Sequence, residues 1–190
     1  MSAISKPAGP AGGLSFLDPR GDALPRPHGN TYWLWAGHVL AGEHPGKEGE
    51  ALLPERLQLL AKMGITHFID LTSQADPFKA YQPLGGAVRI NHPITDFGVP
   101  STAQMQVILR SMDEALTQGG KVYVHCRAGI GRTGTVAATW LVNQGMDGQA
   151  ALALLLQKWQ AVDKHLEEPH TPETEAQRQF VLAWQQPRAN

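Results

Sequence analysis

Cys126 is the only cysteine of the chain, and it stands where an apolar run ends and a glycine-rich turn begins, in KVYVHCRAGIGRTG. Gly129, Gly131 and Gly134 follow it. Glycines let the backbone curl so that successive N–H groups point into one hollow that can bind an anion. A helix beginning near Gly131 would direct the positive end of its dipole at the same hollow. The pattern therefore predicts a cysteine that ionises near neutral pH and acts as a nucleophile.

Arg132 lies six positions after Cys126, so a curled loop can return its guanidinium over the opening. The planar fork of N–H donors matches two oxygens of a phosphoryl group, which a lysine cannot do. A thiolate, a ring of backbone donors and a guanidinium together indicate a phosphate-binding nucleophile rather than a protease or redox site. A lone free cysteine is more often a small buried apolar residue, but the joint pattern from His125 to Gly134 favours anion chemistry.

The strands and helices that must position this loop follow from residue periodicity. TYWLWAGHVLAGEHPG predicts one or two short strands, and ITHFIDLT, AVRINHPI and KVYVHC predict three more. Helices are predicted in ALLPERLQLLAKMG, from the N-cap Ser101 to Gly119, and three times in the C-terminal part, the last with Pro172 at its first helical position. Alternating strands and helices predict an α/β fold, a three-layer sandwich with a central, mostly parallel sheet flanked by helices. Cys126 then stands at the carboxyl end of a strand, where ligands bind in such folds.

Composition indicates one domain with an N-terminal arm. Ten of the first thirty residues are Gly or Pro, which predicts an irregular arm over residues 1–30 and a catalytic domain over residues 31–187. Lys and Arg total 16 against 17 Asp and Glu, so no global basic field exists to attract nucleic acid. The oligomeric state stays open.

The expected location and cofactors follow from sequence patterns that this chain lacks. A single cysteine excludes an intramolecular disulfide and favours a reducing, cytoplasmic location. The N-terminus has no apolar segment of signal-peptide length, and the aliphatic run 150–156 is too short to span a membrane, so we expect no integral membrane protein. His38, His44, His165 and His170 are interpreted as surface or capping residues, and neither a metal nor another cofactor is expected.

Three segments resemble a known family. HCRAGIGRTG resembles the His-Cys-x5-Arg-Ser/Thr loop of the cysteine-dependent protein tyrosine phosphatase superfamily. PITDFGVP, residues 93–100, resembles the acid loop of its dual-specificity members, especially the phosphatase that associates with cyclin-dependent kinases and the mitotic-exit phosphatases. GITHFIDLT is similar to the strand that precedes that loop. The resemblance extends roughly from Tyr32 to Trp184 and implies a protein tyrosine phosphatase-like fold.

This resemblance implies a catalytic role for each of five residues. Cys126 would attack phosphorus and form a cysteinyl-phosphate, while Arg132 would hold the phosphate oxygens. His125 would orient the loop from behind, and Thr133 would donate its hydroxyl to the thiolate. Asp96 would protonate the leaving oxygen and then activate water. The substrate-binding backbone would come from Arg127, Ala128, Gly129, Ile130 and Gly131.

Other readings of the polar residues stay open. On local sequence alone Asp96 is a turn residue, and its assignment as the acid rests on the acid-loop resemblance. Asp70, at a strand end, is the rival carboxylate and is expected to fix a neighbouring loop. TPETEAQRQFV resembles the glutamine-bearing segment of the lipid-phosphatase branch, which implies that Gln177 lies near the attacking water; a surface helix position explains this glutamine equally well.

Substrate class is only partly indicated. No segment matches the tyrosine-bearing loop of tyrosine-only enzymes, which implies a shallower, dual-specificity site. Phosphoinositide-specific relatives carry two basic loop residues where this chain has Arg127 but Ile130, and Arg127 could bind either a second anion or an acidic neighbour. We expect a phosphorylated protein as substrate, on tyrosine and also serine or threonine. The alternatives are a phosphoinositide, inositol phosphate or nucleotide phosphatase, and an inactive phosphate-binding module; a rhodanese-like sulfurtransferase ranks last.

Overall fold

The computed structural model describes residues 23–185, and in this part of the chain five strands form one sheet in the order β1-β2-β5-β3-β4. The strands are β1 (Thr31–Trp35), β2 (Val39–Glu43), β3 (His67–Asp70), β4 (Val88–Asn91) and β5 (Val122–Cys126). β1 pairs antiparallel with β2, and every other pairing is parallel. The predicted mostly parallel sheet is confirmed. Its central strand, β5, is the one that ends at the cysteine.

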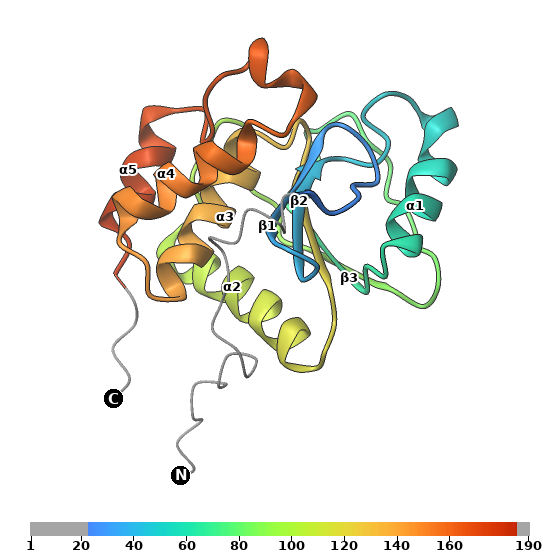
Figure 1. Cartoon of the computed structure of the whole chain (residues 1–190), viewed down its shortest axis with the longest axis horizontal. Coiled ribbons are helices and arrows are strands. Elements are labelled where there is room, and N and C mark those ends of the chain that lie inside the picture. The colour runs from blue at the N-terminus through green and yellow to red at the C-terminus, as the bar shows by residue number, and fades with distance from the viewer. Residues whose placement is uncertain (1–22, 186–190) are drawn as a thin grey trace.

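Helices cover both faces of this sheet. They are α1 (Leu53–Lys62), α2 (Thr102–Thr117), α3 (Gly131–Asn143), α4 (Gly148–Trp159) and α5 (Glu175–Ala183), with the short 3-10 helices η2 (Glu50–Leu52) and η3 (Asp163–Leu166). Figure 1 shows α1 alone on one side of the sheet and the other four helices on the opposite side. The three-layer α/β sandwich expected from the sequence is therefore confirmed.

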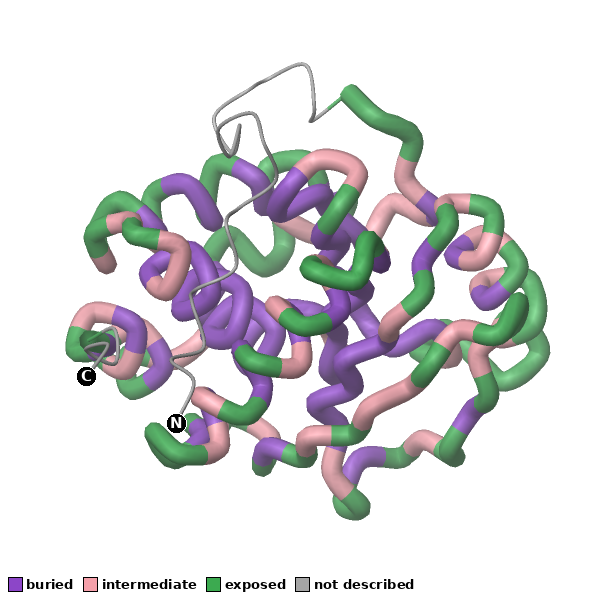
Figure 2. Tube along the Cα trace, turned by 90° about the horizontal axis from the view of Figure 1, so that it is seen from below, coloured by how far each residue is buried: buried purple, intermediate pink, exposed green. Residues whose placement is uncertain are grey.

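The core divides at the sheet into a large and a small cluster. The large cluster lies between the sheet and helices α2 to α5, and it contains Trp140, Trp159 and Trp184. The small cluster packs α1 residues such as Leu60 on Phe68 and neighbouring aromatic rings. α3 is buried along almost its whole length, and Figure 2 shows the buried stretches gathered at the centre. Because α3 follows the cysteine loop directly, that loop is anchored in the best-packed part of the protein.

Two local predictions need correction. α5 begins at Glu175 rather than at Pro172, because Thr174 is the N-cap: its hydroxyl accepts from the Gln177 N–H, and the Gln177 side chain accepts from the Thr174 N–H. Of the two readings of His44, surface or capping, the first is wrong: the residue is buried, its ring stacks on Phe78 at 4.0 Å, and its Nδ1 accepts from the Gly46 N–H at 3.0 Å.

The predicted arm lies mostly outside the described residues. Residues 1–22 are outside them, whereas 23–30 contact the domain: the Trp33 indole donates to Pro25 O at 3.1 Å, and Arg26 Nη1 donates to Thr31 O at 2.6 Å. The division between arm and domain at residue 30 stays a prediction. Between residues 23 and 185, no helix has the length and apolar character needed to cross a membrane.

Candidate active site

The loop between β5 and α3, residues 126–132, is called the phosphate loop below. It begins at Cys126, which is 3% exposed, and Gly131 starts the following helix. Gly129 has φ +77°, and a Cβ there would lie 2.5 Å from the backbone carbon of Gly42 in β2. Only glycine allows both this conformation and this close approach. The predicted strand, glycine turn and helix are therefore present, with the loop pressed against the end of β2.

Arg132 is buried, and the two terminal nitrogens of its guanidinium both donate to one carboxylate. Its Nη1 and Nη2 donate to the two carboxylate oxygens of Asp76 at 2.8 Å each, and Nη1 also donates to Ile94 O at 3.0 Å. Burial lowers the pKa of Arg132, but the hydrogen bonds that it donates to Asp76 and the surrounding negative charges outweigh burial and raise the pKa. The Nε–H is buried with no partner among residues 23–185. Arg132 thus keeps a donor for an incoming oxyanion while Asp76 fixes the far end of the fork.

Asp76 was not predicted from the sequence. It lies in the loop after β3, in TSQADPF, where an aspartate before a proline is typical of a turn. It is also bound by Ser73, whose N–H donates to Oδ2 at 2.8 Å. Burial raises the pKa of Asp76, but the hydrogen bonds from Arg132 and Ser73 dominate and hold that pKa at about 2. Asp76 is therefore an anion at neutral pH, and it orients Arg132.

Asp96 reaches the same guanidinium from the opposite loop. Its Oδ1 lies 2.9 Å from Arg132 Nη2, and its Oδ2 lies 3.7 Å from Arg127 Nη1. The Asp96 side chain is 37% exposed and the Arg127 side chain 47%. Of the two readings of Arg127, the structure shows the contact with an acidic neighbour. It also brings Asp96, which lies thirty residues before Cys126 in the sequence, to the mouth of the phosphate loop.

His125 lies behind the loop in a fully buried position. Its Nδ1 lies 3.3 Å from Cys126 O and its Nε2 2.6 Å from the Tyr81 hydroxyl. Burial lowers the pKa of His125 in spite of the opposing charge of Asp70, so the ring is neutral. Because a carbonyl only accepts, Nδ1 carries the proton and Nε2 accepts from Tyr81. His125 thus sits where a loop-orienting residue should, and Tyr81 fixes its tautomer.

Asp70 serves the loop that follows β3. Its Oδ1 accepts from the Thr72 N–H at 2.8 Å and from the Thr72 hydroxyl at 2.6 Å, and its Oδ2 lies 2.6 Å from Arg89 Nη2. These contacts match the expectation that Asp70 fixes a neighbouring loop.

Thr133 and Gln177 make contacts that the resemblance does not indicate. The Thr133 hydroxyl donates to Gly42 O, at a long 3.5 Å, instead of to the Cys126 sulfur. Gln177 is buried rather than on the surface of its helix. Its Nε2 donates to Gly98 O at 3.1 Å, while its Oε1 accepts from the backbone of α5's N-terminus. Gln177 therefore joins the acid loop to α5, directly above Gly131.

Glu173 is a second carboxylate at the mouth of the phosphate loop, and the sequence did not indicate its role there. A Cβ on Gly131 would lie 2.9 Å from its Oε2, which places the carboxylate over the start of α3. Burial, together with the charges of Glu168 and Asp96, raises the pKa of Glu173. The mouth therefore carries two carboxylates, Asp96 against the two arginines and Glu173 beside the helix N-terminus.

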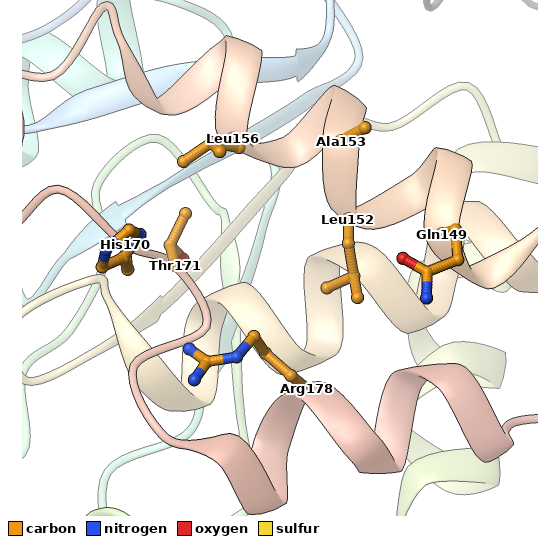
Figure 3. Close-up of a pocket in the computed structure, with 7 residues that line it drawn as sticks. All are labelled: Gln149, Leu152, Ala153, Leu156, His170, Thr171 and Arg178. Atoms are coloured by element: carbon orange, nitrogen blue, oxygen red, sulfur yellow. The ribbon is translucent and has the colours of Figure 1, made fainter.

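A groove of about 390 Å³ lies behind the phosphate loop, between α4 and the segment that leads into α5. Figure 3 shows Leu152 and Leu156 of α4 on one side and His170, Thr171 and Arg178 on the other. It is separate from the mouth, although the Thr171 hydroxyl donates to Ile130 O at 2.8 Å and so touches the loop from behind.

The sheet order, the cysteine loop and the converging arginine and aspartate define a phosphatase-like protein of the dual-specificity class. A family model described as "Swiss Army Knife protein, DSP-PTPase phosphatase domain" (PTP-SAK) matches residues 30–181, and the chain belongs to this family. The superfamily predicted from the cysteine motif is thereby confirmed.

Curated and solved relatives agree with this assignment. The "putative tyrosine phosphatase 067L" of Invertebrate iridescent virus 3 is 32% identical over 91 residues, which cover 46% of this chain and 38% of the viral protein. The chain spans 30% to 38% of the length of the curated relatives it matches.

Three solved structures are similar over most of the chain. Tk-PTP in its active form is 26% identical, with a TM-score of 0.59, over 76% of this chain and 88% of that one. TpbA of P. aeruginosa in complex with pTyr is 21% identical, with a TM-score of 0.59, over 84% and 87%. PTPMT1 in complex with PI(5)P is 18% identical, with a TM-score of 0.59, over 77% and 88%. The latter two, at this identity, show the fold alone.

Proposed function

We propose that this protein is a phosphatase that hydrolyses phosphate monoesters through a cysteinyl-phosphate intermediate, with phosphotyrosine, and also phosphoserine or phosphothreonine, of proteins as its substrate. One observation carries this proposal: Arg132 lies six residues after Cys126 and contacts Asp96 at 2.9 Å, so a nucleophile, an anion-binding fork and a proton donor meet at one opening. A loop with only a structural role would not need these three groups together.

In the first step the phosphoryl oxygens bind Arg132 and the N–H groups of the phosphate loop. A bound phosphoryl oxygen replaces the Asp96 carboxylate at Arg132 Nη2, and the released Asp96 takes up a proton from solvent and turns toward the leaving group. The Cys126 thiolate attacks phosphorus, an S–P bond forms and the P–O bond to the leaving group breaks. The electron pair goes to the leaving oxygen, which takes its proton from Asp96.

In the second step water attacks the cysteinyl-phosphate. Asp96, now a carboxylate, accepts a proton from this water while the new P–O bond forms and the S–P bond breaks, which returns the thiolate. Gln177 and Glu173 lie beside the entry to the loop, at Gly131. Their placement supports a role in ordering this water, with Gln177 acting through its hold on the acid loop rather than as a free amide.

A protein substrate is supported by the character of the opening. Phe97, next to Asp96, is 59% exposed and Val99 is 42% exposed, so apolar surface for a peptide side chain flanks the acid. TpbA has been solved with pTyr and PTPMT1 with PI(5)P, so both substrate classes occur on this fold. Arg127 is the one loop side chain that could meet a second phosphate, and its contact with Asp96 favours the protein substrate over a phosphoinositide. A cytoplasmic location belongs to the same proposal.

Turnover of a small aryl phosphate by the wild-type protein and by Cys126→Ser tests the reaction. We expect the substitution to abolish turnover, a loss on the order of 10⁴-fold or more, because no other nucleophile is positioned for attack. Activity that survives it would contradict the proposal.

Release of inorganic phosphate from matched panels of phosphopeptides and phosphoinositide vesicles tests the substrate class. Higher kcat/KM on phosphopeptides is the expected result. A preference for the lipids would leave the mechanism in place and replace the substrate.

A further inference from the structure

Three carbonyl groups of the phosphate loop accept hydrogen bonds from groups outside it. The His44 N–H donates to Arg127 O at 3.1 Å, Lys164 Nζ donates to Ala128 O at 2.9 Å, and the Thr171 hydroxyl donates to Ile130 O at 2.8 Å. The donors come from three separate elements: the end of β2, the 3-10 helix η3 and the segment before α5. The backbone is therefore held from its outer side at three points.

These contacts fix the direction of the N–H groups that would bind phosphate. A trans peptide unit is planar, and its C=O and N–H point in opposite directions. When a partner outside the loop holds the oxygen of residue 128, the N–H of Gly129 is turned toward the inner side, where Arg132 lies. The positive φ of Gly129, +77°, makes this peptide the one that would most readily take another orientation, since glycine populates many backbone conformations.

Lys164 differs from the other two donors because it is charged and belongs to a short irregular helix. Its long stem would not hold a defined position unless another group fixed the ammonium. Glu43 provides that anchor: its Oε2 lies 2.7 Å from Lys164 Nζ, and the residue is 1% exposed. Glu43 is paired with Cys126 in the register of β2 and β5, so the anchor lies on the neighbouring strand, next to the nucleophile.

The anchor is itself held in place. Asn30 Nδ2 donates to Glu43 Oε1 at 3.2 Å, and Arg56 Nη1 lies 3.7 Å from the same oxygen. The start of η3 is tied to the chain before β1, since the Asp163 N–H donates to Gly29 O at 3.0 Å. Both ends of the Glu43–Lys164 pair are thus tied to residues 29–30, just before β1, and the remaining donors of the ammonium can be directed at the loop.

We propose that Lys164, anchored by Glu43, is a positioning residue that holds the Ala128–Gly129 peptide so that the Gly129 N–H faces the bound phosphate. This inference rests on the proposed function, because it assigns Lys164 a part in binding the phosphoryl group. Lys164 touches neither substrate nor the reacting atoms; it acts through the backbone. Its positive charge also lies close to the loop and stabilises an anion there.

Binding of tungstate, a tetrahedral oxyanion, to the full-length protein measures this effect without requiring turnover. Isothermal calorimetry on Lys164→Met should show tungstate affinity reduced by about tenfold to a hundredfold, less than the roughly 10²–10³ that follows removal of an oxyanion donor, because the Gly129 N–H is displaced and not removed. Lys164→Arg, which can still donate to Ala128 O and pair with Glu43, should retain most of the affinity. Glu43→Gln, which removes the anchor and leaves the lysine, should fall between the two.

Lys121 supplies the matched control. Its Nζ donates to the carbonyl of Met63 at 3.1 Å, the same kind of contact at the opposite end of β5. Lys121→Met should leave tungstate affinity unchanged. An affinity for Lys164→Met equal to that of Lys121→Met and the wild type would overturn the inference, and so would a Lys164→Arg variant as impaired as Lys164→Met.

Loss of folding in Lys164→Met is a separate risk, because it leaves the buried Glu43 carboxylate without its nearest cation. The double variant Glu43→Gln/Lys164→Met removes that unpaired charge. We expect it to show the same loss of tungstate affinity as the single lysine variant, and full affinity in the double variant would overturn the inference.

Failure of this inference and failure of the proposed function give different results. If the wild-type protein binds tungstate in a Lys164-dependent way yet hydrolyses no phosphate ester, the inference stands and the proposed reaction is wrong. If the wild type hydrolyses an aryl phosphate and Lys164→Met matches it in kcat/KM and tungstate affinity, the reaction stands and the inference is wrong.

Discussion

The phosphate loop and the acid loop face each other across one opening, yet they are held by different means. Residues 126–132 are mostly buried, with Cys126 3% exposed, and their backbone is fixed by Gly129 against β2 and by the start of α3. Residues 93–100, the acid loop, carry Asp96 at 37% side-chain exposure and Phe97 at 59%. Phe97 has φ +59°, an uncommon backbone conformation for a bulky residue.

This difference separates binding from proton transfer. Groups that bind the phosphoryl oxygens act best when they are oriented before the substrate arrives, which a buried, glycine-determined loop achieves. The acid must leave Arg132 when a phosphate binds and then meet two different oxygens, so it is carried on an exposed loop tied down by side-chain contacts from other elements. Each of the following experiments alters one of the two loops, or a contact that holds a functional group of that loop in place.

Removal of the acid should give the largest graded effect. For Asp96→Ala we expect a loss on the order of 10²–10⁴ in kcat with alkyl phosphates and a much smaller loss with aryl phosphates, whose leaving groups need less protonation. Paired kcat measurements on the two substrate types provide the test. Equal losses on both would show that Asp96 shapes the loop without donating a proton.

A methyl group on the phosphate loop should be the next most damaging change. In Gly129→Ala the new Cβ meets the backbone of β2 at 2.5 Å and the φ of +77° is strained, so we expect a loss of about 2 kcal/mol or more in unfolding free energy, together with weaker oxyanion binding.

Gly85→Ala is the control for Gly129→Ala, because Gly85 has φ +68° with nothing within 4 Å of its added Cβ. It should lose about 1 kcal/mol from backbone strain alone and bind oxyanions normally. Chemical denaturation measures both variants, and equal losses would mean that contact with β2 is unimportant.

The contacts of Asp76 should make the unfolding free energy of the protein depend on pH in the acid range. Its folded pKa of about 2 lies below the ordinary aspartate value of 3.8, so the stability it contributes is complete above pH 4 and is lost as the pH falls toward 2. The shift corresponds to roughly 2 kcal/mol. Unfolding free energies of wild type and Asp76→Asn, measured from pH 6 to pH 2, should converge by about that amount; parallel curves would contradict the assignment.

Removal of the hydrogen bond between Gln177 and the acid loop should have the smallest effect on activity. Gln177→Ala and Thr174→Ala both break the capping box of α5 and should each cost about 1 kcal/mol. Only Gln177→Ala also removes the hydrogen bond to Gly98, so it alone should lower kcat, by a few-fold. Equal kcat values for the two variants would show that the contact with the acid loop has no catalytic consequence.

The features that could be predicted from the sequence are those that depend on residues close together in the chain. The strand, glycine turn and helix around Cys126 all follow from residues adjacent in the chain, and Ser101 caps α2 through its bond from the Gln104 N–H, as expected. The parallel sheet follows from the alternation of strands and helices, and the family from the cysteine motif.

The contacts missed were those between residues far apart in the chain. Asp76 binds Arg132 across 56 positions, and Lys164 reaches Ala128 across 36, each from an irregular segment whose local sequence indicates only a turn. Nothing in the sequence beside His44 indicates that Phe78 covers its ring. Pairings of this kind depend on how the chain folds back on itself, which periodicity and spacing do not encode.

The covalent intermediate is the central claim, and rapid acid quench of the protein mixed with an aryl phosphate tests it directly. Mass spectrometry of the quenched protein should find one phosphoryl group, located on Cys126 and absent when Cys126→Ser is treated in the same way. Steady hydrolysis with no phosphoryl group on the protein, or with the group on another residue, would contradict the account.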